Sequence, residues 1–353
     1  MGKIRLGIIF GGISTEHDVS IVSGTSVIKN LNKEKYEIYP IYISKEGKWY
    51  HYTKKIEEID LLEIGKEIEE KKEIANQLDE LKKLDVVFPV LHGLGGEDGT
   101  IQGLLELLKI PYVGCKVLAS SIGMDKAYTK VMFEKANINQ AEYIYVKKAK
   151  ENYYLISKDF SQKILPLELI TEKVEKTIGL PVFVKPSNSG SSVGIRKAKD
   201  KIELEEAIGY AAQFDSKILI EKNITGHEVE CAVLGNEEVI ASSVGEILAA
   251  EDFYTYDAKY KNQESKVVIP ANISNEIIEE IRKLAIKAFQ AIDGKGLARV
   301  DFFVGENNKI YINEINTMPG FTTISMYPKL WEKAGIPYST LLDKLIQLAL
   351  EEK

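Results

Sequence analysis

Two short β runs within residues 299–320, separated by a polar turn, constrain this chain more than any other stretch. Successive side chains along a strand point to opposite faces of a sheet, so alternate residues share a face. If the hairpin closes at its two central asparagines, Asp301 stands opposite Glu314 and Arg299 stands opposite Asn316. One face of the hairpin would then hold two carboxylates, one amide oxygen and one guanidinium.

The same register assigns the neighbouring residues to faces. Phe303 and Ile312 are expected on the polar face with the charged groups. The other face is expected to pack mostly in the core and to hold Val300, Phe302, Asn313 and Ile315.

The charged groups on this hairpin predict a metal site. Two opposed carboxylates repel each other unless a positive charge lies between them. Asp301, Glu314 and Asn316 offer only oxygen atoms, which suits Mg²⁺, an ion that often keeps few protein ligands beside waters and substrate phosphates. The alternative is a hairpin whose polar face is simply solvated.

Composition narrows the class of protein. A chain of 353 residues with 44% hydrophobic and 28% charged residues is expected to form two or three globular domains. A net charge of −7 argues against nucleic acid as the main partner, and the apolar runs are too short for a membrane span. The chain start does not resemble a secretory signal, and Cys115 and Cys231 lack metal-ligand spacing, so we expect a reduced, cytoplasmic protein.

The first third of the chain predicts a parallel α/β unit. Residues 4–10 form a β run that leads through Gly11-Gly12 into a helix ending near Asn30, without the Gly-x-Gly-x-x-Gly fingerprint. Glu16 and His17 at the helix mouth could bind a charged ligand group, or Ser14 or Thr15 could cap the helix with support from Glu16.

Further strands are expected at 36–43 and 85–91, with surface helix over 54–83 between them. The glycine-dense loop that starts at His92 follows the third strand, where ligands bind in such units, although His92 could also be an ordinary loop histidine.

The middle of the chain carries a second candidate site. A β run at 181–186 holds Lys185 and feeds a loop of glycines and serines at 187–194, whose backbone N–H groups could cradle phosphate oxygens. It lacks a Walker sequence, and a flexible polar turn is the alternative. Helices are expected over 124–136, 201–213, 274–292 and from about 340, with a strand at 217–221. The irregular, tyrosine-rich stretch 245–265 is typical of a lid or binding loop.

Six motifs occur in consistent order between residues 4 and 348. They are Gly11-Gly12-x-Ser14-x-Glu16-His17-x-Val19-Ser20, His92-Gly93-x-x-Gly96-Glu97-Asp98-Gly99, Met124-Asp125-Lys126, Val184-Lys185-Pro186 with Gly190-Ser191-Ser192-Val193-Gly194, Arg299-Val300-Asp301-Phe302, and Asn313-Glu314-Ile315-Asn316-Thr317-x-Pro319-Gly320. Together these motifs resemble the D-alanine–D-alanine ligases of the ATP-grasp superfamily.

The resemblance implies a fold and a reaction. The fold would mix α/β and α+β parts, with an N-terminal parallel α/β domain at 1–117, a central ATP-grasp lobe at 118–223, and a C-terminal lobe with the lid loop and metal site at 224–353. ATP would phosphorylate the carboxylate of one D-alanine, and the amine of a second D-alanine would displace phosphate to give the dipeptide used in peptidoglycan. Two Mg²⁺ or Mn²⁺ ions and a homodimer are also implied.

The resemblance assigns a role to individual residues. ATP would contact Lys126, Lys185, Ser192, Glu221, Glu228 and Lys259, and the metal would bind Asp301, Glu314 and Asn316. The substrates would contact Glu16, His92, Ser325 and Met326, with Ser191 and Tyr260 hydrogen-bonded around Glu16. Arg299 and the backbone N–H of Gly320 would face the developing oxyanion.

The product is the least constrained part of this interpretation. Lys259-Tyr260 in the lid and Met326 after Ser325 resemble the dipeptide-forming members, and ligases that use D-serine or D-lactate as the second substrate are the alternatives. Discrimination between such small groups in an apolar pocket amounts to about 1–3 kcal/mol. A regulatory protein that binds nucleotide without catalysis is a competing hypothesis, although all the lysines and metal-ligand candidates are present.

Overall fold

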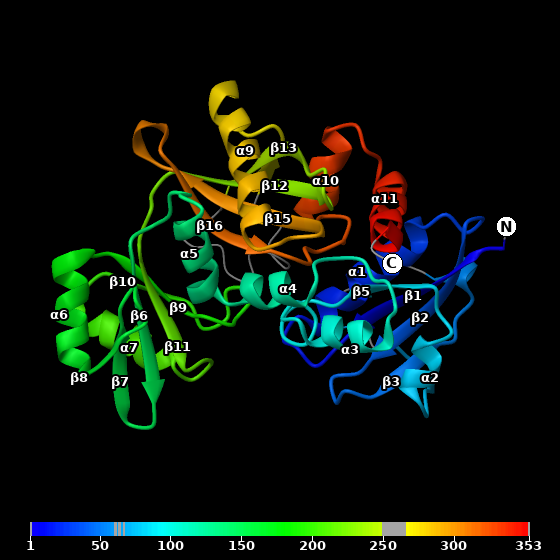
Figure 1. The fold of residues 1–353 in the computed structure, drawn as a ribbon, viewed down its shortest axis with the longest axis horizontal. Coiled ribbons are helices and arrows are strands. Elements are labelled where there is room, and N and C mark those ends of the chain that lie inside the picture. Colours follow the sequence, from blue (N-terminus) through cyan, green and yellow to red (C-terminus); the bar gives the residue numbers. More distant parts are fainter. Residues whose placement is uncertain (1, 60–61, 63–64, 66–67, 249–265, 352–353) are drawn as a thin grey trace.

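The computed structural model describes residues 2–59, 62, 65, 68–248 and 266–351, and this part of the chain forms three β-sheets with helices packed against them (Figure 1). The predicted combination of α/β and α+β parts is confirmed. Every helix in the described ranges is too short or too polar to cross a membrane.

The first sheet has five strands in the order β4-β3-β2-β1-β5. They are β1 (Ile4–Gly11), β2 (Tyr36–Ile43), β3 (Trp49–Tyr52), β4 (Lys71–Glu73) and β5 (Val86–Val90). As predicted, β1 pairs in parallel with both β2 and β5. Its helices are α1 (His17–Asn30), α2 (Gln77–Leu81) and α3 (Thr100–Leu108), with a short turn of 3₁₀ helix at Ile56–Glu58.

The expectation of a surface helix over 54–83 is wrong for the described part of that segment. It contains the 3₁₀ turn, the edge strand β4 and the five-residue helix α2. Ile59 and Ile68 are buried in the core beside the first sheet, and Ile74 is buried in a second cluster. The segment therefore buries its apolar residues as an irregular cover, which a composition rich in Lys, Glu and Ile did not reveal.

The second sheet has six strands in the order β10-β9-β11-β6-β7-β8. They are β6 (Tyr143–Ala149), β7 (Asn152–Ile156), β8 (Gln162–Leu165), β9 (Val182–Pro186), β10 (Arg196–Ala198) and β11 (Lys217–Lys222). Helices α6 (Leu167–Thr177) and α7 (Lys201–Ala211) close a separate apolar core on it. Before this sheet, α4 (Val117–Met124) and α5 (Lys126–Lys135) lead out of the first sheet.

The third sheet has five strands in the order β14-β13-β12-β15-β16 and holds the late hairpin. They are β12 (His227–Gly235), β13 (Ile240–Leu248), β14 (Lys266–Val268), β15 (Gly296–Val304) and β16 (Ile310–Asn316). Its helices are α9 (Asn275–Ala291), α10 (Met326–Lys333) and α11 (Tyr338–Glu351).

The hairpin pairs its functional end as predicted but departs from the predicted register near the turn. Asp301 stands opposite Glu314 and Arg299 opposite Asn316, yet Phe302 pairs with Ile312. The turn holds three residues, Glu306–Asn308, and a β-bulge at Asn313 takes up the difference.

The bulge reverses two of the predicted faces. Ile312 is buried in the core with Phe302 and Val300, although it was expected on the polar face. Asn313 was expected to face the core, and it lines the pocket described below. The bulge inserts one extra residue into β16. The predicted pairing therefore holds from Glu314 to Asn316 but not between the bulge and the turn.

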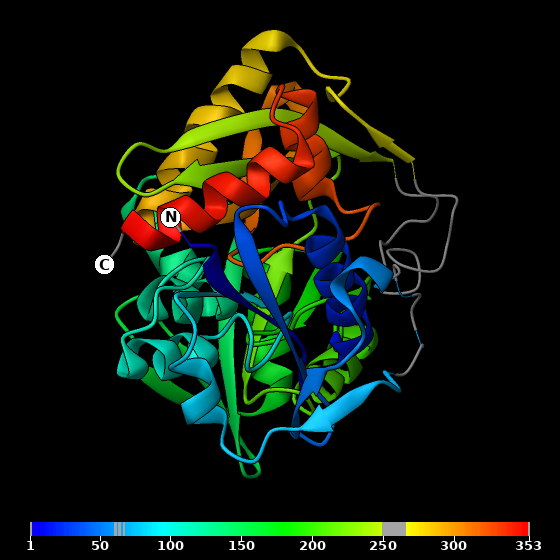
Figure 2. The ribbon, with the colours of Figure 1, turned by 90° about the vertical axis from the view of Figure 1, so that its right-hand side faces the viewer.

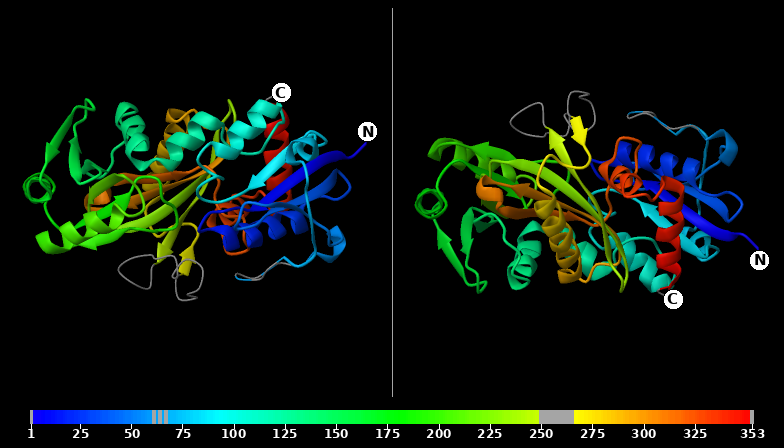
Figure 3. Two further views of the ribbon diagram at one scale, coloured as in Figure 1. Left: turned by 90° about the horizontal axis from the view of Figure 1, so that it is seen from below. Right: turned by 90° about the horizontal axis from the view of Figure 1, so that it is seen from above.

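The first and third sheets share one apolar core. Phe88 of β5 meets Phe321 edge to face, with ring centroids 5.3 Å apart. Helix α11 packs over the first sheet although it follows the third in sequence (Figure 2). Strand β1 and α11 lie at the end of the molecule opposite the second sheet (Figure 3). The shared core joins the first and third of the three predicted domains. The domain boundaries at 117/118 and 223/224 stay predictions.

Candidate active site

A pocket of about 700 Å³ lies between the second and third sheets. Strands β9 and β11 and the Gly/Ser loop after β9 line it from one side, and β12, β13, β15 and β16 line it from the other. Residues of several predicted motifs meet there: Lys126, Lys185, Ser191, Ser192, Glu221, Glu228, Asp301 and Glu314. Motifs that lie far apart in the sequence thus contribute to one concave site.

Arg299 holds the Asp301 carboxylate with two parallel hydrogen bonds. Its Nε donates to Oδ1 and its Nη2 donates to Oδ2, both at 2.7 Å, and its Nε also lies 3.0 Å from Glu230 Oε2. Burial alone would lower the pKa of the Arg299 guanidinium. The attraction of Asp301 and Glu230 is larger, so the pKa of Arg299 is raised well above its ordinary value. Arg299 therefore orients Asp301 within the sheet.

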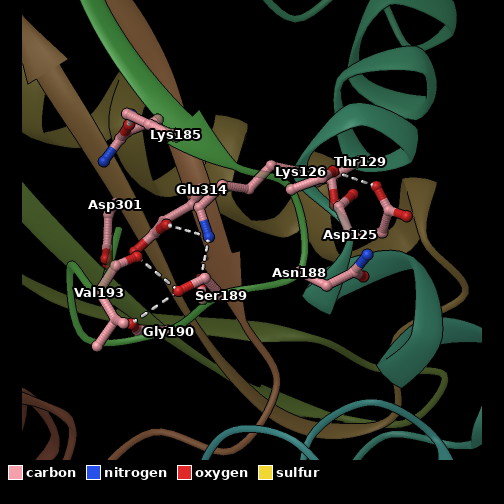
Figure 4. A network of polar contacts seen from close by, with 12 residues as sticks. Asp125, Lys126, Thr129, Lys185, Asn188, Ser189, Gly190, Val193, Asp301 and Glu314 are labelled. Atoms are coloured by element: carbon pink, nitrogen blue, oxygen red, sulfur yellow. Dashed lines mark hydrogen bonds and ion pairs between the residues drawn. The ribbon is translucent and has the colours of Figure 1, made fainter. Parts of the chain in front are cut away.

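Lys126 reaches the hairpin from the first turn of α5. Its Nζ donates to the Ser189 carbonyl at 2.6 Å and lies 3.6 Å from Glu314 Oε2 (Figure 4). Asp125 caps α5 by accepting from the N–H groups of Ala127 and Tyr128, and it also contacts Lys217 and Ser187. The cap fixes the start of the helix, and hence the direction in which Lys126 leaves it.

Lys185 on β9 lies at the floor of the pocket. Its Nζ is 2.6 Å from Glu221 Oε2 and donates to Asn313 Oδ1 at 3.3 Å. Glu221 also meets Lys130 of α5, with Nζ 2.5 Å from Oε1. Burial alone would raise the pKa of Glu221, but Lys130 and Lys185 outweigh it and hold that pKa at about 2, so Glu221 is ionised.

Glu16 and Ser191 meet across the junction between the first and second sheets. The Ser191 hydroxyl donates to Glu16 Oε1. A Cβ built on Gly93 or on Gly190 would lie 2.7 Å from Glu16 Oε2, so both glycines leave room for this carboxylate. The predicted contact between Glu16 and Ser191 is present in the structure.

His92 is a buried connector between the first and third sheets. One ring nitrogen lies 3.0 Å from the Met318 carbonyl and the other lies 3.0 Å from the Ser23 hydroxyl. Burial lowers the pKa of His92, which favours the neutral ring. Ser23 also accepts from the Phe321 N–H, so His92 helps to fix the loop that follows the hairpin.

Four further predicted residues lie at the end of the hairpin or just beyond it. Asn316 accepts a hydrogen bond from the Met318 N–H at 3.0 Å. The Ser325 hydroxyl accepts from the Thr322 N–H, and a Cβ on Gly320 would lie 2.7 Å from it. Met326 is buried in the core shared by the first and third sheets and does not line the pocket.

Ser192 lies in the Gly/Ser loop, where Ser191 and Ser192 have positive φ angles of 48° and 61°. Successive backbone N–H groups in a turn can point to a common anion, which suits this loop to phosphate binding. Glu228 of β12 faces the same pocket. The predicted Lys259 and Tyr260 lie outside the described residues.

Sequence reasoning missed Lys130, Asn313 and Glu230. Lys130 follows Lys126 by four residues, a spacing that puts both on one helix face and could have indicated it. Glu230 follows Glu228 by two residues on a strand and so shares its face. Asn313 carried no such signal, because the bulge that turns it toward the pocket depends on the length of the turn.

The oxygen atoms at the hairpin fit a hard divalent cation. Asp301 is buried and Glu314 is about one-third exposed, so the pair offers a carboxylate edge to the pocket. Within the described ranges, His, Cys, Asp and Glu side chains do not form a group of three or more that could hold a metal ion. A cation here would thus take two carboxylates, the Asn316 amide and oxygens from a bound ligand.

Comparisons with known proteins agree with these features. Two family models match the chain: "D-ala D-ala ligase N-terminus" over residues 5–115 and "D-ala D-ala ligase C-terminus" over residues 132–347. The D-alanine–D-alanine ligase of Acetivibrio thermocellus is 51% identical, with 99% of this chain and 96% of the relative covered. The corresponding ligase of Caldicellulosiruptor bescii is 50% identical, with 100% and 96% covered.

Solved structures give the same grouping. The VanG D-Ala:D-Ser ligase of Enterococcus faecalis superposes with a TM-score of 0.84 at 37% identity, covering 99% of this chain and all of the other. The D-alanine–D-alanine ligase of Coxiella burnetii superposes with a TM-score of 0.79 at 33% identity, covering 99% and 94%. The predicted ATP-grasp fold is thereby confirmed, and the chain belongs to the D-alanine–D-alanine ligase family.

Proposed function

We propose that this protein is an ATP-dependent D-alanine–D-alanine ligase that supplies the dipeptide for peptidoglycan synthesis. The observation that carries the proposal is the meeting of Lys126, Lys185, Asp301 and Glu314 in one pocket, next to the Glu16–Ser191 contact. Full-length relatives that are about 50% identical and named for this reaction support it.

The reaction would proceed in two steps. A carboxylate oxygen of the first D-alanine attacks the γ-phosphorus of ATP, which forms an acyl phosphate and releases ADP. The amine of the second D-alanine then attacks the acyl carbon, loses a proton, and expels inorganic phosphate. A carboxylate approaching a polyanionic phosphate needs cations to offset the repulsion.

The chain's own residues suit the nucleotide end of this reaction. Lys126, Lys185 and Lys259 would contact the phosphates, together with backbone N–H groups around Ser192. Glu228 would contact adenosine. Glu221 would contact it as well, because an ionised carboxylate can accept more hydrogen bonds than its two lysine partners supply. Asp301, Glu314 and Asn316 would hold one or two Mg²⁺ or Mn²⁺ ions, which would neutralise phosphate oxygens when bound.

The substrate end would lie at the junction of the three sheets. Glu16 would hold the ammonium group of the first D-alanine, with Ser191 and Tyr260 completing the hydrogen bonds around it. His92 would flank the same substrate, while Ser325 and Met326 would define the position of the second. Arg299 and the N–H of Gly320 would stabilise the oxyanion that forms on amine attack.

Phosphate release in the presence of ATP and Mg²⁺ tests the proposal. We expect turnover with D-alanine and none above background with L-alanine. Release that is indifferent to the stereochemistry of alanine, or absent with both, would refute the assignment.

A ligase for D-alanine and D-serine is the second candidate, because the solved structure with a TM-score of 0.84 is named for that product. Incubation with equal D-alanine, D-serine and D-lactate, followed by mass spectrometry of the product, distinguishes these acceptors. We expect the dipeptide of D-alanine to dominate.

A homodimer in the cytoplasm completes the proposal. Both cysteines are free and buried, which suits a reducing compartment. Light scattering of the purified chain tests the dimer, for which we expect twice the chain mass of 39.6 kDa.

A further inference from the structure

One carboxylate at the floor of the pocket is shared by two lysines. Glu221 has Lys130 at 2.5 Å on Oε1 and Lys185 at 2.6 Å on Oε2. The side chains of Lys130 and Glu221 are 3% and 5% exposed, so water contributes little to their solvation. Glu221 is thus in direct contact with both ammonium groups, while Glu314 and Glu228 also attract Lys185 from further away.

The two lysines differ in what they face. Lys185 lines the pocket and also reaches Asn313 on the hairpin, whereas Lys130 lies behind Glu221 and does not line the pocket. The Tyr143 ring lies 5.3 Å from the Lys130 Nζ and covers it. Burial lowers the pKa of Lys130, and the attraction of Glu221 opposes that shift.

We propose that Lys130 is a positioning residue that keeps Glu221 neutralised so that Lys185 can turn from Glu221 to a phosphate of bound nucleotide. This inference rests on the proposed role of Lys185 in nucleotide binding. Without Lys130, every movement of Lys185 toward a phosphate would leave a buried carboxylate without a counter-charge, which is costly.

Helix α5 makes this arrangement possible. Lys126 and Lys130 stand four residues apart and therefore lie on one face of the helix. Lys126 points to Glu314 on the hairpin, and Lys130 points to Glu221 on β11. One helix thus brings a cation to the proposed phosphate end of the pocket and a second cation to the carboxylate that pairs with Lys185.

Binding measurements with ATP and with adenosine, both in excess Mg²⁺, test the proposal by calorimetry on the full chain. For Lys130→Met we expect ATP affinity to fall by at least about tenfold while adenosine affinity changes little, because adenosine lacks the phosphates that draw Lys185 away. Lys135→Met, which removes an exposed lysine of the same helix, should leave both affinities unchanged. An equal loss of affinity for both ligands in Lys130→Met would indicate a structural role and overturn the inference.

A double variant keeps the test valid if Lys130→Met does not fold. In Glu221→Gln the buried charge is gone, so removing Lys130 as well should leave the ratio of ATP to adenosine affinity within about threefold of Glu221→Gln alone. A further tenfold loss of that ratio in the double variant would show that Lys130 does not act through Glu221.

Lys185→Met distinguishes a failure of the proposed nucleotide role of Lys185 from a failure of the role proposed for Lys130. If it leaves the ratio of ATP to adenosine affinity unchanged, the proposed nucleotide role of Lys185 fails, and this inference fails with it. If Lys185→Met lowers the ratio while Lys130→Met does not, the proposed function stands and the role of Lys130 alone is refuted.

Discussion

The Ser191 hydroxyl donates a hydrogen bond to the Glu16 carboxylate, although the two residues are 175 positions apart in the chain. Ser191 lies in the loop after β9 of the second sheet, and Glu16 directly precedes α1 of the first. Gly93 and Gly190 both leave space beside the Glu16 carboxylate. The contact therefore places a substrate-binding candidate where two sheets meet, within reach of the pocket.

Replacing Ser191 by alanine should impair the use of D-alanine more than the use of ATP. A hydrogen bond to a charged group contributes about 1.5–3 kcal/mol, so we expect kcat/KM for D-alanine to fall about tenfold to a hundredfold. The KM for ATP should change little, because Glu16 lies on the substrate side. Steady-state phosphate release, with each substrate varied in turn, measures both.

The matched control for this variant is Ser161→Ala. Ser161 also donates its hydroxyl to a carboxylate, that of Asp159, but in an exposed turn of the second sheet. We expect no kinetic change there. A Ser191→Ala enzyme with the kinetics of this control would show that the contact does not serve substrate binding.

Glu314→Gln should abolish turnover while leaving the fold intact. The substitution keeps the shape of the side chain but removes the charge that faces Lys126 and the proposed cation. Loss of a group that stabilises transition-state charge costs about a hundredfold to a thousandfold in kcat. Phosphate release and thermal unfolding followed by circular dichroism measure the two effects, with the exposed Glu332→Gln as control. Near-normal turnover in Glu314→Gln would remove Glu314 from the metal site.

Glu97 should make the protein less stable as the pH rises. Burial, with a contribution from the charge of Glu16, raises the pKa of Glu97 from 4.5 to about 8. Between these two values the folded protein holds a proton that the unfolded chain has released, so raising the pH lowers the free energy of unfolding. Urea unfolding between pH 5 and about pH 8 measures this slope.

In Glu97→Gln that contribution disappears, because glutamine does not titrate. The amide oxygen can still accept from the Gly93 N–H, which donates to Glu97 at 2.8 Å. We expect a smaller loss of stability over this pH range than in the wild type, and an unchanged slope in the exposed variant Glu151→Gln. Identical slopes in wild type and Glu97→Gln would contradict the raised pKa.

Local patterns predicted part of the fold, and left the strands and the helix between residues 143 and 177 unassigned. Short apolar runs marked β1, β9 and β11, and the helices predicted over 124–136 and 274–292 match α5 and α9 to within a few residues. The segment 54–83 failed because its lysines and glutamates suit a solvated helix as well as an irregular cover. The apolar surface around α1, which Ile59 and Ile68 bury, favours the irregular cover over the helix.

The candidate site was predictable where residue type carries the chemistry. The pairing of Asp301 with Glu314 was predicted from a turn closing at the two asparagines, and it holds because the bulge at Asn313 offsets the longer turn. Lys185 was predicted from its place before the Gly/Ser loop. Lys130 was missed although its spacing from Lys126 places both on one helix face, because its role as a counter-ion depends on Glu221 lying beside it in space. The shared core of α11 with the first sheet was missed for the same reason, since a long-range contact leaves no local pattern.

The bulge at Asn313 gives the last prediction, because it adds a residue to β16 between two regular pairs. Phe302 stands opposite Ile312 and Asp301 opposite Glu314, so Asn313 is the extra residue. Deleting Asn313 should therefore give a regular ladder in which Glu314 still faces Asp301, while Lys185 loses the amide oxygen to which it donates at 3.3 Å. A hydrogen bond from a charged group contributes about 1.5–3 kcal/mol, so we expect turnover to persist and the KM for ATP to rise about tenfold. Deleting Asn307 removes the same residue type from the turn itself, where Asn307 has a φ of 57°, and should leave the KM for ATP unchanged. Steady-state phosphate release measures both variants, and complete loss of turnover in the Asn313 deletion would show that the bulge itself is needed to hold Glu314 in place.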